Sequence, residues 1–346
     1  MARAAQVFAG VGRTNPGGLV GIFRRDAGGS DWQHVFADAE VQALTVHPQD
    51  PNVVFAGSKA GVLRSDDGGV TWRRAGFPDD DAAIWSVMVH PHDPKIVIAG
   101  GSPVCIFRSE DGGQTWRRLP DPPIRDRVKM PFASRVMRLA TRPGRPEEIF
   151  GALEVNGVMR SRDLGETWED CSDDLARQST EPHLKSRIAS DSESEGMLDS
   201  HALAITDARP EKVFLAVRMG LFASTDDGAT WQDMQVGRFS PLRYARDIRV
   251  SPQDPAIMYA CLSVAAFSEQ GSLYRSTDVG ETWHRFDHGV QPASTVMAVA
   301  LHQTDPAQVH MTTRGGQVFA TLDGGTTWRE APLPPDTRDV YALACG

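Results

Sequence analysis

The sequence predicts an all-β protein built from seven repeats of four short strands. Three observations support this prediction: a motif that recurs along the chain, a spacing of 40 to 63 residues between its tryptophans, and many turn-forming residues. The 346 residues include 32 glycines and 23 prolines, which favours many strands joined by tight turns over long helices. Repeats of this length also favour one continuous domain over the two that the length alone suggests.

The repeated motif is Ser-x-Asp-x-Gly-x-Thr-Trp. Clear copies begin at Ser65, Ser109, Ser161, Ser224, Ser276 and Thr321, and a weaker copy at 24–32 keeps the glycine and the tryptophan. Short polar side chains cap turn amides, glycine adopts positive φ, and tryptophan packs between neighbouring units. We therefore expect the motif aspartates to be structural.

Strands are predicted on both sides of each motif. Alternating apolar segments at 41–48, 84–91, 136–143, 200–205, 245–252 and 296–302 are first strands; segments such as 52–57 and 61–65 are second and third strands. Residues 339–344 resemble a first strand and 6–10 a second strand. We therefore expect the two ends of the chain to share one unit, which removes the exposed sheet edges.

These motifs resemble those of the Asp-box (BNR-repeat) β-propeller superfamily, which includes sialidases, xyloglucan-degrading glycosidases, sortilin-type receptors and photosystem II assembly propellers. The resemblance covers essentially the whole chain. It implies a single seven-bladed β-propeller over 1–346 with four-stranded antiparallel blades. It also implies that the motif lies in the hairpin between the third and fourth strands, on the face away from the active site. Ligands of such propellers bind around the central channel on the opposite, top face.

Composition restricts the partners. With 36 basic and 45 acidic residues the net charge is −9, which argues against nucleic acid or an anionic membrane as the main partner. No apolar run is long enough for a membrane span or a signal sequence. The four cysteines are dispersed without metal-ligand spacing, so we expect reduced thiols and a cytoplasmic protein.

Two long loops interrupt the repeat on the top face. The insertion at 169–199 mixes acidic, basic and serine residues, and the loop 117–134 is a shorter excursion. Loops longer than about 12–15 residues are uncommon in compact domains and are often functional. We expect the insertion to be either a polar lid or a solvated excursion.

The first strands place one ring of side chains around the channel: Gln42, Trp85, Met137, His201, Arg246, Met297 and Tyr341. The next ring is small except for Arg138 and Asp247. Because buried charges are costly unless paired or used, these two either form an internal ion pair that seals the channel or act on a ligand. In the second case Arg138 binds an anion and Asp247 is an acid or base.

Several cations are expected at the channel mouth. Lys59, Arg218 and Arg314 each stand two residues before a hairpin glycine, and Arg135 and Arg246 lie nearby. Either exposed hairpins simply favour such residues, or the mouth is positive and binds an anionic or richly hydroxylated ligand.

His201 is the best candidate for a general acid or base, because its reference pKa is near 6.5, although a structural role is an alternative. Asp199 and Asp247 are its candidate catalytic partners. His183, His201 and Asp199 are weak candidates for a divalent metal, since no ligand spacing supports one. No motif requires a cofactor.

Two functions follow from these residues. The first is a hydrolase or lyase, glycosidase-like, acting on a polar and anionic sugar or related metabolite. Its substrate contacts would be Arg135, Arg138, Arg218, Arg246, Arg314, Lys59, Tyr244, Tyr341 and Trp85. An ordinary sialidase is disfavoured, because the chain has no Arg-Ile-Pro segment, seven units and no secretion signal. The second is a non-catalytic ligand-binding or assembly propeller that docks a protein partner through the same face. The oligomeric state is open.

Overall fold

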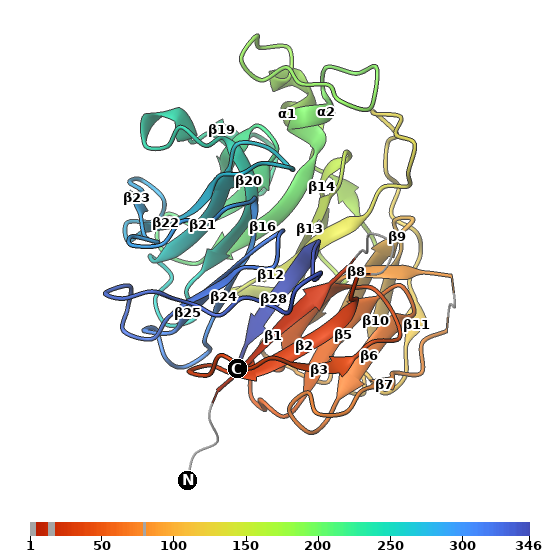
Figure 1. Cartoon of the computed structure of the whole chain (residues 1–346). Helices are drawn as coiled ribbons and strands as arrows, with labels where there is room; N and C mark the ends of the chain where they lie inside the picture. Colours follow the sequence, from red (N-terminus) through yellow and green to blue (C-terminus); the bar gives the residue numbers. More distant parts are fainter. Residues whose placement is uncertain (1–4, 13–17, 79–80) are drawn as a thin grey trace.

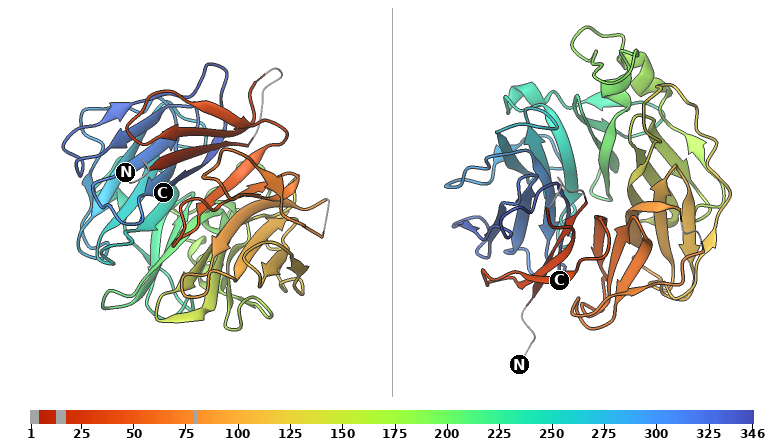
Figure 2. Two further views of the ribbon diagram at one scale, coloured as in Figure 1. Left: turned by 90° about the horizontal axis from the view of Figure 1, so that it is seen from below. Right: turned by 45° about the vertical axis from the view of Figure 1, so that its right-hand side comes forward.

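Seven four-stranded antiparallel sheets form a closed ring, which confirms the predicted seven-bladed β-propeller. A computed structural model describes residues 5–12, 18–78 and 81–346 (Figure 1). Residues 1–4, which begin the segment considered for a signal sequence, lie outside the described part. Figure 2 shows the sheets arranged around a common axis.

The ends of the chain share one blade, as expected. From the axis outward, this blade contains β28 (Val340–Cys345), β1 (Gln6–Val11), β2 (Gly21–Asp26) and β3 (Gln33–Phe36). β28 and β1 pair in antiparallel register, with Phe8 opposite Ala344 and Ala9 opposite Leu343. The C-terminal strand therefore closes the ring from the inside.

The other six blades each follow the chain from the axis to the rim. They are β4 (Val41–Val46), β5 (Val54–Ser58), β6 (Gly61–Ser65) and β7 (Arg73–Arg74); β8 (Ala83–Val89), β9 (Val97–Ser102), β10 (Ile106–Ser109) and β11 (Arg117–Arg118); β12 (Val136–Arg142), β13 (Arg145–Leu153), β14 (Gly157–Ser161) and β15 (Glu169–Asp170); β16 (Ser200–Thr206), β17 (Lys212–Val217), β18 (Gly220–Ser224) and β19 (Gln232–Asp233); β20 (Tyr244–Val250), β21 (Met258–Ser263), β22 (Gly271–Ser276) and β23 (His284–Arg285); β24 (Val296–Leu301), β25 (Val309–Thr313), β26 (Val318–Thr321) and β27 (Arg329–Glu330).

The repeated motif forms the hairpin between the third and fourth strands. In the copy after β6, the Asp67 carboxylate accepts hydrogen bonds from the Thr71 amide at 2.9 Å and the Thr71 hydroxyl at 2.7 Å. The Ser65 hydroxyl accepts the Gly69 amide at 2.8 Å. Gly69 has φ +77°, and a Cβ there would lie 2.2 Å from the Phe8 ring in the neighbouring blade. The motif is therefore a turn that also fixes how closely two blades approach.

Apolar side chains fill the interfaces between neighbouring blades. Each cluster of buried residues draws on two adjacent blades; one, for example, joins Phe8 and Ala344 of the closing blade to Val54 and Leu63 of the next. Burying these apolar faces is the main force that holds the ring together.

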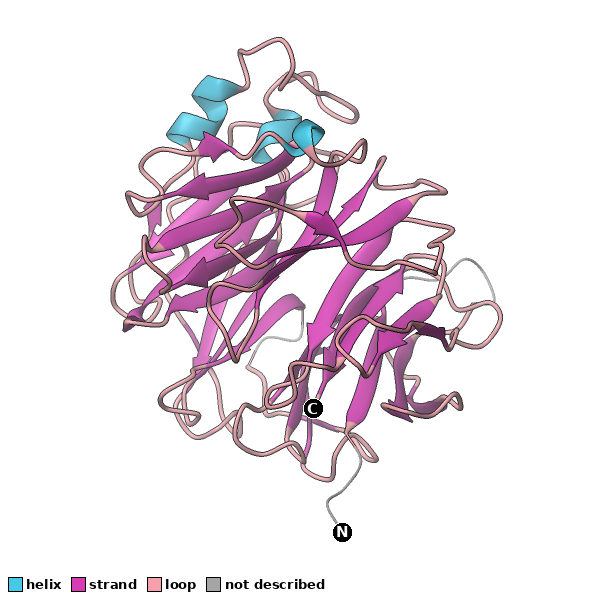
Figure 3. Ribbon diagram, turned by 90° about the vertical axis from the view of Figure 1, so that its left-hand side faces the viewer, coloured by secondary structure: helices cyan, strands magenta, loops and turns pink. Residues whose placement is uncertain are grey.

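The insertion at 169–199 is folded rather than structureless. It begins with β15 and contains α1 (Asp173–Gln178) and α2 (Glu195–Leu198), which stand above the sheets in Figure 3. The only other helical segment in the described residues is a 3-10 turn, η1 (Val236–Arg238). Leu175, Leu184, Met197 and Leu198 are buried in the cluster between two blades, so the insertion is packed onto the top of the ring.

Candidate functional site

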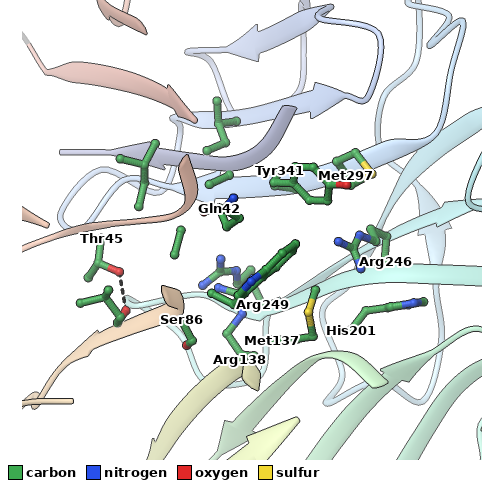
Figure 4. A pocket seen from close by; sticks show the side chains of 17 residues that line it. Gln42, Thr45, Ser86, Met137, Arg138, His201, Arg246, Arg249, Met297 and Tyr341 are labelled. Carbon is green, nitrogen blue, oxygen red and sulfur yellow. Dashed lines mark hydrogen bonds between the residues drawn. The ribbon is translucent and has the colours of Figure 1, made fainter. Parts of the chain in front are cut away.

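The ring of first-strand residues surrounds a cavity on the propeller axis. All seven predicted members line it: Gln42, Trp85, Met137, His201, Arg246, Met297 and Tyr341 (Figure 4). Its volume is about 40 Å³. A second cavity of about 150 Å³ shares Leu44 and Arg249 with it and extends toward the opposite face. The two cavities therefore meet at the level of Leu44 and Arg249.

Arg138 and Asp247 form the internal ion pair that the sequence allowed. Their side chains meet at 3.0 Å, and Arg249 approaches the other carboxylate oxygen at 3.2 Å. The backbone amides of Ile248 and Val299 also donate to Asp247, at 3.0 and 3.2 Å. Four donors occupy this buried carboxylate, an arrangement that favours holding the arginines over transferring protons. Burial and the charge of Arg249 lower the pKa of Arg138 to about 10.

Arg249 was not predicted from the sequence. It lies two residues after Asp247 on β20, so strand alternation already places both side chains on the same side of the sheet. This two-residue spacing is the feature of the sequence from which Arg249 could have been identified.

His201 and Asp199 lie together, as the prediction requires. Nε2 of His201 is 3.2 Å from Asp199, and its Nδ1 is 2.7 Å from the Ala245 carbonyl, to which it must donate. The Tyr244 hydroxyl is 3.3 Å from Nε2. Burial alone would raise the pKa of Asp199, but His201 and Arg218 hold it below its usual range. Burial raises the pKa of Tyr244 to about 12.

Arg218 connects this pair to the insertion. It donates to Asp199 at 2.7 and 2.9 Å and to Glu195 of α2 at 2.9 Å. Glu195 is fully buried and also accepts the amides of Ile188 and Ser190, each at 2.9 Å. Although burial opposes it, these hydrogen bonds lower the pKa of Glu195 to about 2. Sequence reasoning missed Glu195, because only the folded insertion brings it to Arg218.

Arg135 stacks on Trp85 at the mouth, with its guanidinium 4.2 Å from the ring centroid. It is paired at 2.9 Å with Glu154, which follows β13 and was not predicted. Burial and the charge of Asp199 raise the pKa of Glu154. Glu154 could have been identified from the sequence, because it is an acidic residue in a hairpin of the top face. Glu154 and Asp199 thus have pKa values shifted in opposite directions.

The remaining predicted cations differ in environment. Arg314 pairs with Asp339 at 2.8 Å and donates to the Tyr341 hydroxyl at 3.2 Å. Lys59 is exposed and does not line the cavity. The mouth is therefore less positive than expected, because acidic partners neutralise most of its arginines.

Arg246 differs from the other arginines of the mouth, which have acidic partners. It is 9% exposed, lines the cavity and lies 5.9 Å from the Tyr341 ring centroid. Burial would lower its pKa, but the nearby Tyr244, Tyr341 and two carboxylates raise it, so the guanidinium is charged. Within 5–12, 18–78 and 81–346, no carboxylate forms an ion pair with it.

The three weak metal candidates do not lie together. His183 is exposed and 3.7 Å from Asp233, whereas His201 and Asp199 are buried beside the channel. In the part of the chain that the structure describes, no group of three or more His, Cys, Asp or Glu side chains is arranged to hold a metal ion.

Comparisons with known proteins support the fold. No family model and no curated protein matches the chain. The structure of the GH74 xyloglucanase from Xanthomonas campestris is 17% identical over 99% of this chain, with a TM-score of 0.64; the chain spans 52% of its length. YCF48 from Cyanidioschyzon merolae is 17% identical over 89% of this chain and 90% of its own, with a TM-score of 0.57. YCF48 bound to a D1 peptide is 15% identical over 84% and 81%, with a TM-score of 0.54.

These similarities show a propeller fold that serves both a glycoside hydrolase and a peptide-bound protein. Membership of the Asp-box superfamily beyond that fold stays a prediction. Among the described residues, no helix is long and apolar enough to cross a membrane.

Proposed function

We propose that this protein binds a small polar ligand through an anionic group, a carboxylate or phosphate, at the top of the channel. The observation that supports this proposal is the charge of Arg246. Arg138, Arg218 and Arg314 each have an acidic partner, but Arg246 is buried at the cavity without one in the described ranges. A buried charge is costly unless something pairs with it, and a guanidinium suits carboxylate and phosphate.

The test is ligand-induced stabilisation of the purified protein. Acetate, phosphate and a panel of sugar acids should raise the melting temperature of the wild type at constant ionic strength. Arg246→Met should abolish the increase, whereas Lys59→Met, which removes an exposed cation predicted for the same face, should retain it. Equal responses from the two variants would contradict the proposal.

A hydrolase or lyase acting on an anionic sugar is the second candidate. It is favoured by the opposite pKa shifts of Glu154 and Asp199, since groups displaced in this way suit the acid and base roles. Glu154 would donate a proton to the leaving group, and the Asp199–His201 pair would accept one. Asp247, once a candidate for this role, is assigned to the ion pair instead.

An activity screen with anionic glycosides distinguishes the two candidates. If turnover is found, Glu154→Gln should lower kcat at least about 100-fold, as expected for the loss of a general acid. Turnover that survives this change would exclude Glu154 as the acid. A cytoplasmic location stays a prediction; the four cysteines are free thiols.

A further inference from the structure

The hairpin between β21 and β22 exposes apolar side chains on the top face. Val264 is 58% exposed and Phe267 is 76% exposed. Large exposed aromatic side chains in soluble proteins often mark interaction sites, particularly when they lie beside polar contacts.

Phe267 is held in this exposed position. The Arg314 guanidinium stacks on its ring, 3.9 Å from the centroid, and donates to the Ala266 carbonyl at 2.6 Å. Arg314 is itself fixed by Asp339. An aromatic ring that is already ordered loses little entropy when a partner covers it.

The same arginine places the hairpin beside the cavity. Arg314 donates to the hydroxyl of Tyr341, which lines the cavity, and the guanidinium of Arg246 lies near the Tyr341 ring. The exposed ring of Phe267 and the Arg246 guanidinium, which has no ion-pair partner among the described residues, are therefore linked through Arg314 and Tyr341. They form neighbouring parts of one surface.

The enclosed part of the cavity holds only a small group of any larger ligand. A buried water needs about 10–15 Å³, so about 40 Å³ accommodates roughly three waters, or one carboxylate group. The remainder of the ligand must lie above the ring, where the hairpin presents apolar surface. A polypeptide carries carboxylates next to apolar side chains. Nucleic acid is disfavoured, because the protein is acidic and its other mouth arginines are neutralised.

We propose that the top face binds a polypeptide partner, which inserts one carboxylate toward Arg246 and packs an adjacent apolar side chain on Phe267. This inference rests on the proposed function, because both require an anion at Arg246. The carboxylate is either the C-terminus of the partner or an Asp or Glu side chain.

Three pools of synthetic heptapeptides test the proposal. The first has free C-termini and no acidic residues, the second is amidated with one Asp or Glu, and the third is amidated without any carboxylate. The full-length protein should select peptides from the first or second pool, with an apolar residue near the carboxylate, and none from the third. The pool that yields binders identifies the source of the carboxylate.

Surface variants provide the controls. Phe267→Ser should weaken binding of the selected peptides at least about tenfold, while stabilisation by acetate and phosphate stays as in the wild type. Leu322→Ser, which alters a 42% exposed apolar residue in a motif hairpin on the opposite face, should bind like the wild type.

Two results would overturn the inference: equal selection from all three pools, or equal peptide affinity of the Phe267 and Leu322 variants. If acetate and phosphate still act through Arg246 while no peptide binds, the inference fails and the proposed function stands. If no anion acts through Arg246, both fail.

Discussion

Replacing Asp247 by asparagine should lower the stability of the whole ring. The carboxylate holds Arg138 at 3.0 Å and Arg249 at 3.2 Å and accepts hydrogen bonds from two backbone amides. The asparagine side chain has only one acceptor oxygen, and its NH₂ group would face groups that are themselves donors. Removing one partner of a buried ion pair costs about 3–5 kcal/mol. With an unfolding entropy of about 2.1 cal/mol/K per residue, a chain of 346 residues should melt about 4–7 °C lower.

Thermal denaturation followed by circular dichroism measures this change, and Asp66→Asn is the matched control. Asp66 also pairs with two arginines, Arg64 and Arg73, but its side chain is 49% exposed. Each exposed ion pair contributes about 0–1 kcal/mol, so the control, which loses two, should melt less than about 3 °C below the wild type. Equal shifts for the two variants would refute the assignment of Asp247 to a stabilising ion pair.

Three further changes test other parts of the structure. His310 is fully buried, neither of its ring nitrogens has a hydrogen-bond partner among the described residues, and burial lowers its pKa to about 3. In the unfolded chain His310 binds a proton near pH 6.5, whereas in the folded chain it stays neutral down to about pH 3, so acid favours the unfolded state. The free energy of unfolding should therefore fall by about 2 kcal/mol from pH 7 to pH 5 in melting experiments, and His310→Leu should remove that part of the loss. Glu195→Gln should expose the insertion to limited proteolysis, because Glu195 holds the backbone at 188–190; Glu193→Gln, at a solvent-facing ion pair with Lys185, should not. Without added anions, Arg246→Met should not lower the stability measured in urea, because no ion pair among the described residues is lost, and a loss would show that Arg246 is satisfied within the protein.

The repeat made most of the fold predictable. Because each blade repeats the same register, residues aligned in the sequence occupy the same height on the axis; Gln42, His201 and Tyr341 therefore line one cavity as expected. The pairing of the chain ends followed from the same alignment, since 339–344 and 6–10 each resembled one strand of an incomplete blade.

The charge balance of the site was not predictable in the same way. Arg135, Arg218 and Arg314 could be aligned between repeats, but their acidic partners lie in loops and hairpins outside the aligned positions. Glu195 belongs to the insertion, in which the leucines that become buried are interspersed in the sequence with serines and charged residues. Contacts that depend on how an irregular segment folds leave no periodic signal, so only the structure shows that Arg246 has no acidic partner in the described part of the chain.

The strand that closes the ring is the last one to be made. During translation β1 can pair with β2, but its other edge has no partner until β28 is made, more than 300 residues later in the chain. Blades in the middle of the chain have all their strands as soon as they are synthesised, whereas the blade that contains β1 stays incomplete until β28 has been made. Nascent chains are therefore most exposed to mispairing at their N-terminal strands, and chaperones that shield this edge during translation would help this protein most.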